Sequence, residues 1–289
     1  MTSASTDLRT ARRPAAWRGR SRPTDRPSAA AGAYVIARFA LAATMRSRLF
    51  VAFLVACIVP SLVLLIAVYL RYNVAAIEEA ETAISTVLDL DAWLFETALE
   101  IAQAVTFLVV LVVGPALVAP DLANNAMPLY LSRPVPRRAY VVGKLLVLLG
   151  LCVAVGLGPG LLLIVVNAGY GGEVDWLGAA RLASAFTASL LAWTVCLSML
   201  ALAISAWVKW RPAATLGLLS AYIVTTTLDD VLQSALGGRT ASFLDLADAV
   251  QAISATLAGV GEPAMPATLA GMVVAGLAAL ATWALALRL

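Results

Sequence analysis

Six runs of the chain contain no aspartate, glutamate, lysine or arginine. They are residues 49–70, 101–120, 145–172, 182–208, 212–228 and 263–287. A helix needs about 20 apolar residues to cross the hydrocarbon core of a bilayer. Because backbone groups in lipid must form hydrogen bonds within their own segment, uninterrupted runs favour helices over a barrel. We therefore predict an all-α integral membrane protein with six transmembrane helices. The third lies at about 140–170, and the fifth, 212–228, is the shortest.

The composition agrees with a membrane location. Hydrophobic residues make up 62% of the 289 residues and charged residues 13%, and the mean hydropathy is +0.91. Soluble domains carry roughly 25% charged residues, so a soluble enzyme is a poor fit. The chain contains no histidine, which excludes histidine-based catalysis and histidine metal ligands. Cys57, Cys152 and Cys196 each lie in an apolar run, where they are best interpreted as small buried side chains.

The basic residues predict the orientation. Seventeen of them fall on one side of the six spans, and only Arg71, Arg181 and Arg239 fall on the other. The acidic residues divide the opposite way, with 14 of the 17 on the second side. Because lysine and arginine collect on the cytoplasmic side, we expect both termini there. The expected location is the plasma (cytoplasmic) membrane, crossed several times.

Three segments outside the spans have a distinct character. Residues 1–32 are rich in arginine, proline, alanine and serine, which predicts a disordered cytoplasmic tail. Residues 33–48 predict an amphipathic helix at the cytoplasmic interface that leads into the first span. Residues 229–262 form a long external segment, whose second half places apolar residues three and four apart. That spacing predicts an amphipathic helix resting against the outer ends of the spans.

Several kinds of chemistry lack the residues they need. The only Gly-Lys pair, Gly143–Lys144, has no preceding glycine at the spacing of a phosphate-binding loop. The span interiors contain no ionisable pair of the kind that couples transport to ions or protons. For Gln103 and Asn167 we expect interhelical hydrogen bonds. The Gly156–Gly160 spacing predicts close helix packing, and the prolines within spans, Pro159 among them, predict kinks.

The cytoplasmic stretch between the second and third spans is the most informative. Asp121 is placed to cap a short helix at the membrane exit, and Pro128 limits how far that helix continues. Apolar side chains follow, and then a basic cluster of Arg133, Arg137 and Arg138. An apolar surface with a basic rim suits docking to another protein. A positively charged loop that only fixes topology fits the same residues equally well.

This stretch resembles a known family. The residues that carry the resemblance are Asp121, Asn124–Asn125–Ala126, Pro128–Leu129–Tyr130, Ser132–Arg133–Pro134, Arg137, Tyr140 and Gly143–Lys144. They are similar to the cytoplasmic signature of ABC-2-type permeases, the membrane subunits of ATP-binding-cassette exporters. The six-span plan and the interfacial helix extend the resemblance over residues 33–289. Ala123 departs from the pattern, since an arginine is expected there, so one contact to the ATPase is missing or supplied differently.

The resemblance implies roles for three segments. Segment 121–139 would fit a groove on a separate ATPase subunit, and its coupling residues would be Asp121, Leu122, Asn124, Asn125, Leu129, Tyr130, Arg133 and Arg137. The interfacial helix would make a second contact, with Arg38, Arg46 and Arg48. Segment 229–262 would belong to an external gate that includes Asp229, Asp230, Phe243 and Leu246.

The resemblance also implies an assembly. Two permease chains, identical or different, would pack together over two copies of an ABC ATPase. The ATPase would bind ATP and Mg²⁺ and hydrolyse the ATP, while this chain would bind no cofactor or metal and would have no catalytic residue. The bilayer is the remaining expected partner, and no nucleic acid is expected.

Two other classes of protein stay open. The first is a non-transporting membrane scaffold or assembly factor, whose acidic outer face would bind a partner. The second is an ion-coupled secondary transporter, which the charge-free spans disfavour. Its best support is the presence of Glu100, Asp229 and Asp230 at the external span ends.

Overall fold

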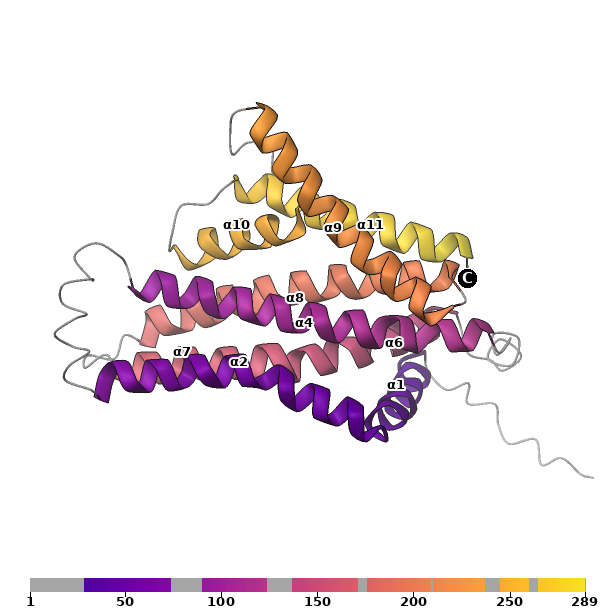
Figure 1. The fold of residues 1–289 in the computed structure, drawn as a ribbon, viewed down its shortest axis with the longest axis horizontal. Coiled ribbons are helices and arrows are strands. Elements are labelled where there is room, and N and C mark those ends of the chain that lie inside the picture. Colours follow the sequence, from indigo (N-terminus) through magenta and orange to yellow (C-terminus); the bar gives the residue numbers. More distant parts are fainter. Residues whose placement is uncertain are drawn as a thin grey trace, which may run out of the picture.

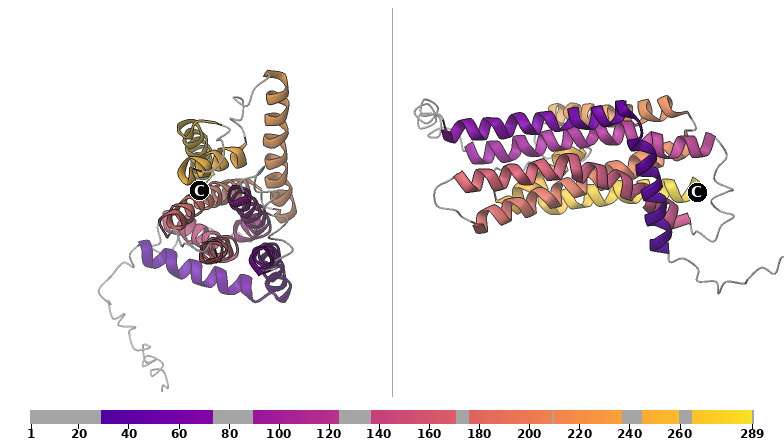
Figure 2. Two further views of the ribbon diagram at one scale, coloured as in Figure 1. Left: turned by 90° about the vertical axis from the view of Figure 1, so that its left-hand side faces the viewer. Right: turned by 90° about the horizontal axis from the view of Figure 1, so that it is seen from below.

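The computed structural model describes residues 29–73, 90–123, 137–170, 176–208, 210–236, 245–259 and 265–288. Every regular element in these ranges is helical (Figure 1). The elements are α1 (Ala29–Met45), α2 (Arg48–Asn73), α4 (Leu90–Ala123), α6 (Arg137–Cys152), the π-helical segment η1 (Val153–Leu157), α7 (Gly158–Tyr170), α8 (Trp176–Trp207), α9 (Arg211–Leu236), α10 (Leu246–Ala258) and α11 (Ala267–Arg288). Most of the long helices lie side by side, and α1 crosses one end of the bundle (Figure 2). We call that end the α1 end and the opposite end the far end.

Among the described residues, five helical segments are long and apolar enough to cross a bilayer. They are Arg48–Leu70, Trp93–Ala119, Ala139–Tyr170, Trp176–Trp207 and Ala267–Leu287. The prediction of a helical membrane protein is confirmed, and five of the six predicted spans have a counterpart. The second begins at Trp93 rather than Ile101, because α4 extends through the exposed Glu96 and Glu100 toward the far end.

The predicted span at 212–228 lies within α9, which is not among these five segments. Three threonines and two aspartates, residues 225–227 and 229–230, make the second half of α9 polar. The helices α8 and α11 run in the same direction, because Cys196 Sγ donates to Val274 O at 3.4 Å and Trp207 Nε1 donates to Ala284 O at 3.3 Å. The chain therefore returns through α9 from the α1 end, and α9 diverges from the bundle as it does so (Figure 1).

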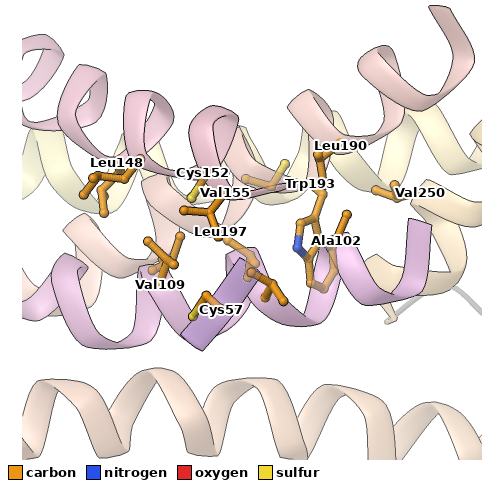
Figure 3. Packing of buried hydrophobic residues seen from close by; sticks show 14 of the residues in the cluster. Cys57, Ala102, Val109, Leu148, Cys152, Val155, Leu190, Trp193, Leu197 and Val250 are labelled. Atoms are coloured by element: carbon orange, nitrogen blue, oxygen red, sulfur yellow. The ribbon is translucent and has the colours of Figure 1, made fainter. Parts of the chain in front are cut away.

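The core is centred on α4 and α8. The two helices approach so closely that a Cβ on Gly114 would lie 2.7 Å from the Cβ of Ala201. The largest fully buried side chain, Trp193, donates from Nε1 to the carbonyl of Gln103 at 3.1 Å and so joins α8 to α4 (Figure 3). Since lipid tails are as apolar as leucine, this close packing of small residues is what holds membrane helices together.

Asn167 and Gln103, the larger polar side chains of the spans, differ in their hydrogen bonding. Tyr72 OH donates to Asn167 Oδ1 at 3.1 Å, so the predicted interhelical hydrogen bond of Asn167 is confirmed between α2 and α7. For Gln103 the interhelical bond is made by the backbone carbonyl, while the buried side-chain nitrogen Nε2 has no partner within the described residues.

The third span is interrupted halfway along. The helix α6 passes into the π-helical turn η1, in which the Gly158 N–H bonds to Val153 O, and α7 then begins with Gly158–Pro159. Proline lacks an N–H and its ring crowds the preceding turn, so a wider turn relieves the strain there. The kink that the sequence predicts at Pro159 thus takes the form of a π turn directly before Gly158–Pro159.

The glycines Gly156 and Gly160 confirm the predicted close packing. A Cβ on Gly156 would lie 2.7 Å from Thr106 Cγ2 on α4, and a Cβ on Gly160 would overlap the ring of Phe186 on α8.

The helix α10 runs alongside α8 and α11 (Figure 1). Near the start of α8, Arg181 Nε donates to the carbonyl of Leu257 in α10 at 3.0 Å. The expected position of α10 against the outer ends of the spans stays a prediction. Val250 belongs to the same buried cluster as Leu190 and Trp193 of α8 (Figure 3). Small residues such as Ala249 and Ala252, both fully buried, let the helix pack this closely.

We predict that Gly160→Val lowers the thermal stability of the purified chain. The added side chain must displace the buried ring of Phe186, and overpacking of this kind costs about 1–3 kcal/mol. Gly169→Val is the matched control in the same helix, because a Cβ there meets no atom within 4 Å. Thermal unfolding in detergent checks the prediction, and equal stability of the two variants would contradict it.

Candidate functional site

A nearly buried ion pair joins α4 to α6 at the α1 end. Lys144 Nζ lies 3.0 Å from Asp121 Oδ2 and donates to the carbonyl of Leu117 at 2.7 Å. Tyr140 OH donates to the same Asp121 oxygen at 2.7 Å. The side chain of Lys144 is 8% exposed and that of Asp121 is 20% exposed, so little water screens the pair. We call these three residues the Lys144 cluster.

The local helix geometry explains the cluster. The helix α4 continues through Asp121 to Ala123, so Asp121 lies in the last turn of α4 rather than capping a new helix. A carboxylate is unfavourable at a helix C-terminus, where the macrodipole is negative, and a cation is favourable. Lys144 supplies that cation. In α6 the four-residue spacing of Tyr140 and Lys144 puts both on the face that meets α4.

The adjacent face of α6 carries α1. A Cβ on Gly143 would lie 2.9 Å from the carbonyl oxygen of Ala33 and 3.0 Å from Ile36 Cβ. Ala139, one turn earlier in α6, is buried as well. The absence of a side chain at Gly143 therefore lets α1 cross directly on the α6 backbone, and the adjacent Lys144 holds α4.

The chain matches a known protein family over most of its length. The family model described as ABC-2 family transporter protein matches residues 34–288, which is most of the chain. The chain belongs to the ABC-2 transporter family. A search of curated proteins finds no match. The match begins within α1 and ends at the last helix, so it includes both helices that flank the Lys144 cluster. The chain is therefore a membrane permease of the ABC transporter class.

The predicted coupling residues of this permease lie partly outside the described residues. Asn124, Asn125, Leu129, Tyr130 and Arg133 all lie there. Leu122 lies in the last turn of α4 and Arg137 begins α6, so the two helices enclose the predicted segment. Asp121 is the coupling residue whose contacts the structure describes.

The predicted basic residues of the interfacial helix fall on three local structures. Arg38 lies in α1, Arg46 follows its end, and Arg48 begins α2. All three are exposed. Ser47 separates the two helices, and its hydroxyl accepts from the Phe50 N–H at 3.4 Å, as an N-cap does. Arg48 is thus part of the first span rather than of the interfacial helix.

Two of the predicted gate residues, Asp229 and Leu246, have side chains described by the structure. Asp229 of α9 is 2% exposed, and Leu246, the first residue of α10, is buried. Asp230 is also in α9, and Phe243 lies outside the described residues. Within those residues no three histidine, cysteine, aspartate or glutamate side chains are arranged to hold a metal ion.

Asp245 was missed by the sequence interpretation. It is the N-cap of α10, where its Oδ1 accepts from the Ala247 N–H at 2.7 Å. Burial raises the pKa of Asp245. The N-cap bond works against this rise, and the neighbouring Asp248 and Asp229 add to it. The signal that could have found it is an aspartate directly before an amphipathic helical pattern.

We predict that Lys144→Met destabilises the chain by on the order of 2–3 kcal/mol, because it leaves the Asp121 carboxylate without its cation. The expected loss of stability is smaller than that for a fully buried ion pair, because Asp121 is partly exposed. The double variant Lys144→Met/Asp121→Leu recovers part of the loss. Thermal unfolding of the single and double variants measures the coupling. Additive losses would contradict the ion pair, and Arg211→Met serves as an exposed control at the same end.

We predict that Asp245→Asn stabilises the chain at pH 7, whereas Asp245→Ala loses the cap and about 1 kcal/mol. Because the folded pKa is raised, the folded state binds this proton more tightly than the unfolded state. Stability therefore falls as the pH rises from the ordinary value of 3.8 through the raised pKa. Unfolding measured across pH checks this. An unchanged pH profile in Asp245→Asn would contradict it.

Proposed function

We propose that this chain is the permease subunit of an ABC exporter and that a separate ATPase docks at the α1 end. The observation that carries the proposal is the Lys144 cluster. It fixes α4 to α6 at the two helix ends from which segment 124–136 emerges, so a force applied to that segment reaches both helices.

The crossing of α1 supports the same proposal. Through Gly143, α1 packs on the part of α6 that also holds Asp121. We call α1, the last turn of α4 and the first half of α6 the docking unit. An ATPase in contact with α1 and with segment 121–139 would touch two parts of one packed structure.

The proposed topology has six spans with both termini in the cytoplasm. The parallel course of α8 and α11 supports α9 as the fifth crossing, because the chain must return between them. The arginines near the α1 end support a cytoplasmic α1 end. The chain would then be a multi-pass protein of the plasma membrane.

The proposed energy source lies on the partner. The Gly143–Lys144 pair is helical and buried in the docking unit, which supports its structural use over phosphate binding. Two ATPase subunits would bind ATP and Mg²⁺ and hydrolyse the ATP. Closure of the ATPase pair would move the docking units of two permease chains, a homodimer or heterodimer, and turn the pathway between them outward.

We predict that the tagged full chain, purified from its native membrane, brings an ABC ATPase with it. Arg133→Glu reverses a predicted contact charge and should reduce the recovered ATPase at least about tenfold, which corresponds to about 1.4 kcal/mol. Arg211→Glu is the matched control, since Arg211 is an exposed arginine at the same end. Recovery and ATP turnover are measured together. Full-length chain without ATPase would favour the scaffold class, and equal recovery with both variants would contradict docking at 121–139.

A further inference from the structure

Both halves of the third span pack on α4 and α8, but their other attachments differ. The first half, α6, is also bound to α1 at Gly143, and Lys144 pairs it with α4. The second half, α7, is also bound to α2, because Asn167 accepts from Tyr72 and Tyr170 stacks on Tyr72 with ring centroids 5.4 Å apart. A movement of the docking unit relative to α2 would therefore deform the third span between these two attachments.

The point between the attachments is the π turn. In η1 the hydrogen bond from Gly158 N–H to Val153 O spans five residues instead of four, and Pro159 offers no N–H to the turn before it. A π turn in an α-helix often marks a place where the helix bends in function. One side of η1, Val155 and Gly156, is buried against the bundle, while Val153 and Ala154 are exposed.

The glycines of this segment are needed for different reasons. Gly156 and Gly160 must be small, because Thr106 and Phe186 occupy the space of their side chains. Gly158 has a different constraint. Beyond its two chain neighbours, a Cβ there would meet only Val153 O at 3.8 Å, an ordinary contact, but Gly158 is helical, with φ of −56° and ψ of −59°, directly before Pro159. A side chain on the residue before a proline crowds the proline ring in this conformation, so glycine relieves strain at the π turn.

We infer that η1 with Gly158–Pro159 is a hinge, which lets α6 move with the docking unit while α7 stays with α2 and α8. The inference rests on the proposed function for the source of the movement. Gly158 contributes backbone freedom, and Pro159 removes the hydrogen bond that would stiffen the turn. Cys152, whose Sγ lies 3.9 Å from the carbonyl of Thr106, holds the start of the hinge against α4.

The test distinguishes an effect on the stability of the chain from an effect on its coupling to the ATPase. The control Gly150→Ala replaces a helical glycine that has room for a methyl group and should raise the Tm by about 2 °C. In Gly158→Ala the gain in helix propensity is opposed by crowding of the new Cβ against Pro159, so its Tm should change less. In the full complex with its ATPase, Gly158→Ala should lower ATP turnover about fivefold or more, a typical coupling magnitude, and Gly150→Ala should leave turnover unchanged. Turnover at the wild-type rate in a folded Gly158→Ala complex would overturn the hinge.

A second readout needs no ATPase. In the full chain reconstituted in nanodiscs, amide hydrogen exchange should be faster at 153–158 than at 145–150 and 161–166, and Gly158→Ala should slow it. Exchange at 153–158 as slow as in the flanking segments would overturn the hinge. If the purified chain brings no ATPase with it, the proposed function is contradicted. The hydrogen-exchange result then still tests the hinge.

Discussion

The ammonium group of Lys144 is the contact on which the α1 end depends. It neutralises the Asp121 carboxylate, bonds the carbonyl of Leu117 and lies near the Tyr140 ring, 5.4 Å from its centroid. A carboxylate at the end of a long apolar helix is costly without a cation, and a lysine in an apolar helix is costly without an anion. Each charge is thus stable only where the other is, which sets the register of α6 against α4.

That register has consequences along the bundle. With Lys144 facing α4, the neighbouring Gly143 faces α1 and provides the smooth surface on which α1 crosses. Farther along the third span, Gly156 packs against α4 and Gly160 against α8. Small residues at each crossing let the helices approach within lipid, where packing rather than the hydrophobic effect drives association. Gly158, directly before Pro159, follows the π turn.

The sequence predicted the parts of this fold that depend on average polarity. Charge-free runs locate helices in lipid, because an unpaired charge there is expensive. The sequence could not predict pairings between distant positions. Asp121 looked like a helix cap, because its partner Lys144 lies 23 positions later and only the packed fold brings them together. The contact of α10 with α8 and α11 could not be predicted either, because nothing in its amphipathic pattern says whether its apolar face meets lipid or other helices.

The central claim is that α1 and α6 move as one body while α6 moves against α7. Distances between pairs of spin labels on exposed positions test it most directly. Phe39 on α1, Val142 on α6 and Leu162 on α7 are exposed, and the three native cysteines are buried. When ATP binds the complex, we expect the Phe39–Val142 distance to stay constant and the Val142–Leu162 distance to change. A changed Phe39–Val142 distance with a constant Val142–Leu162 distance would contradict it.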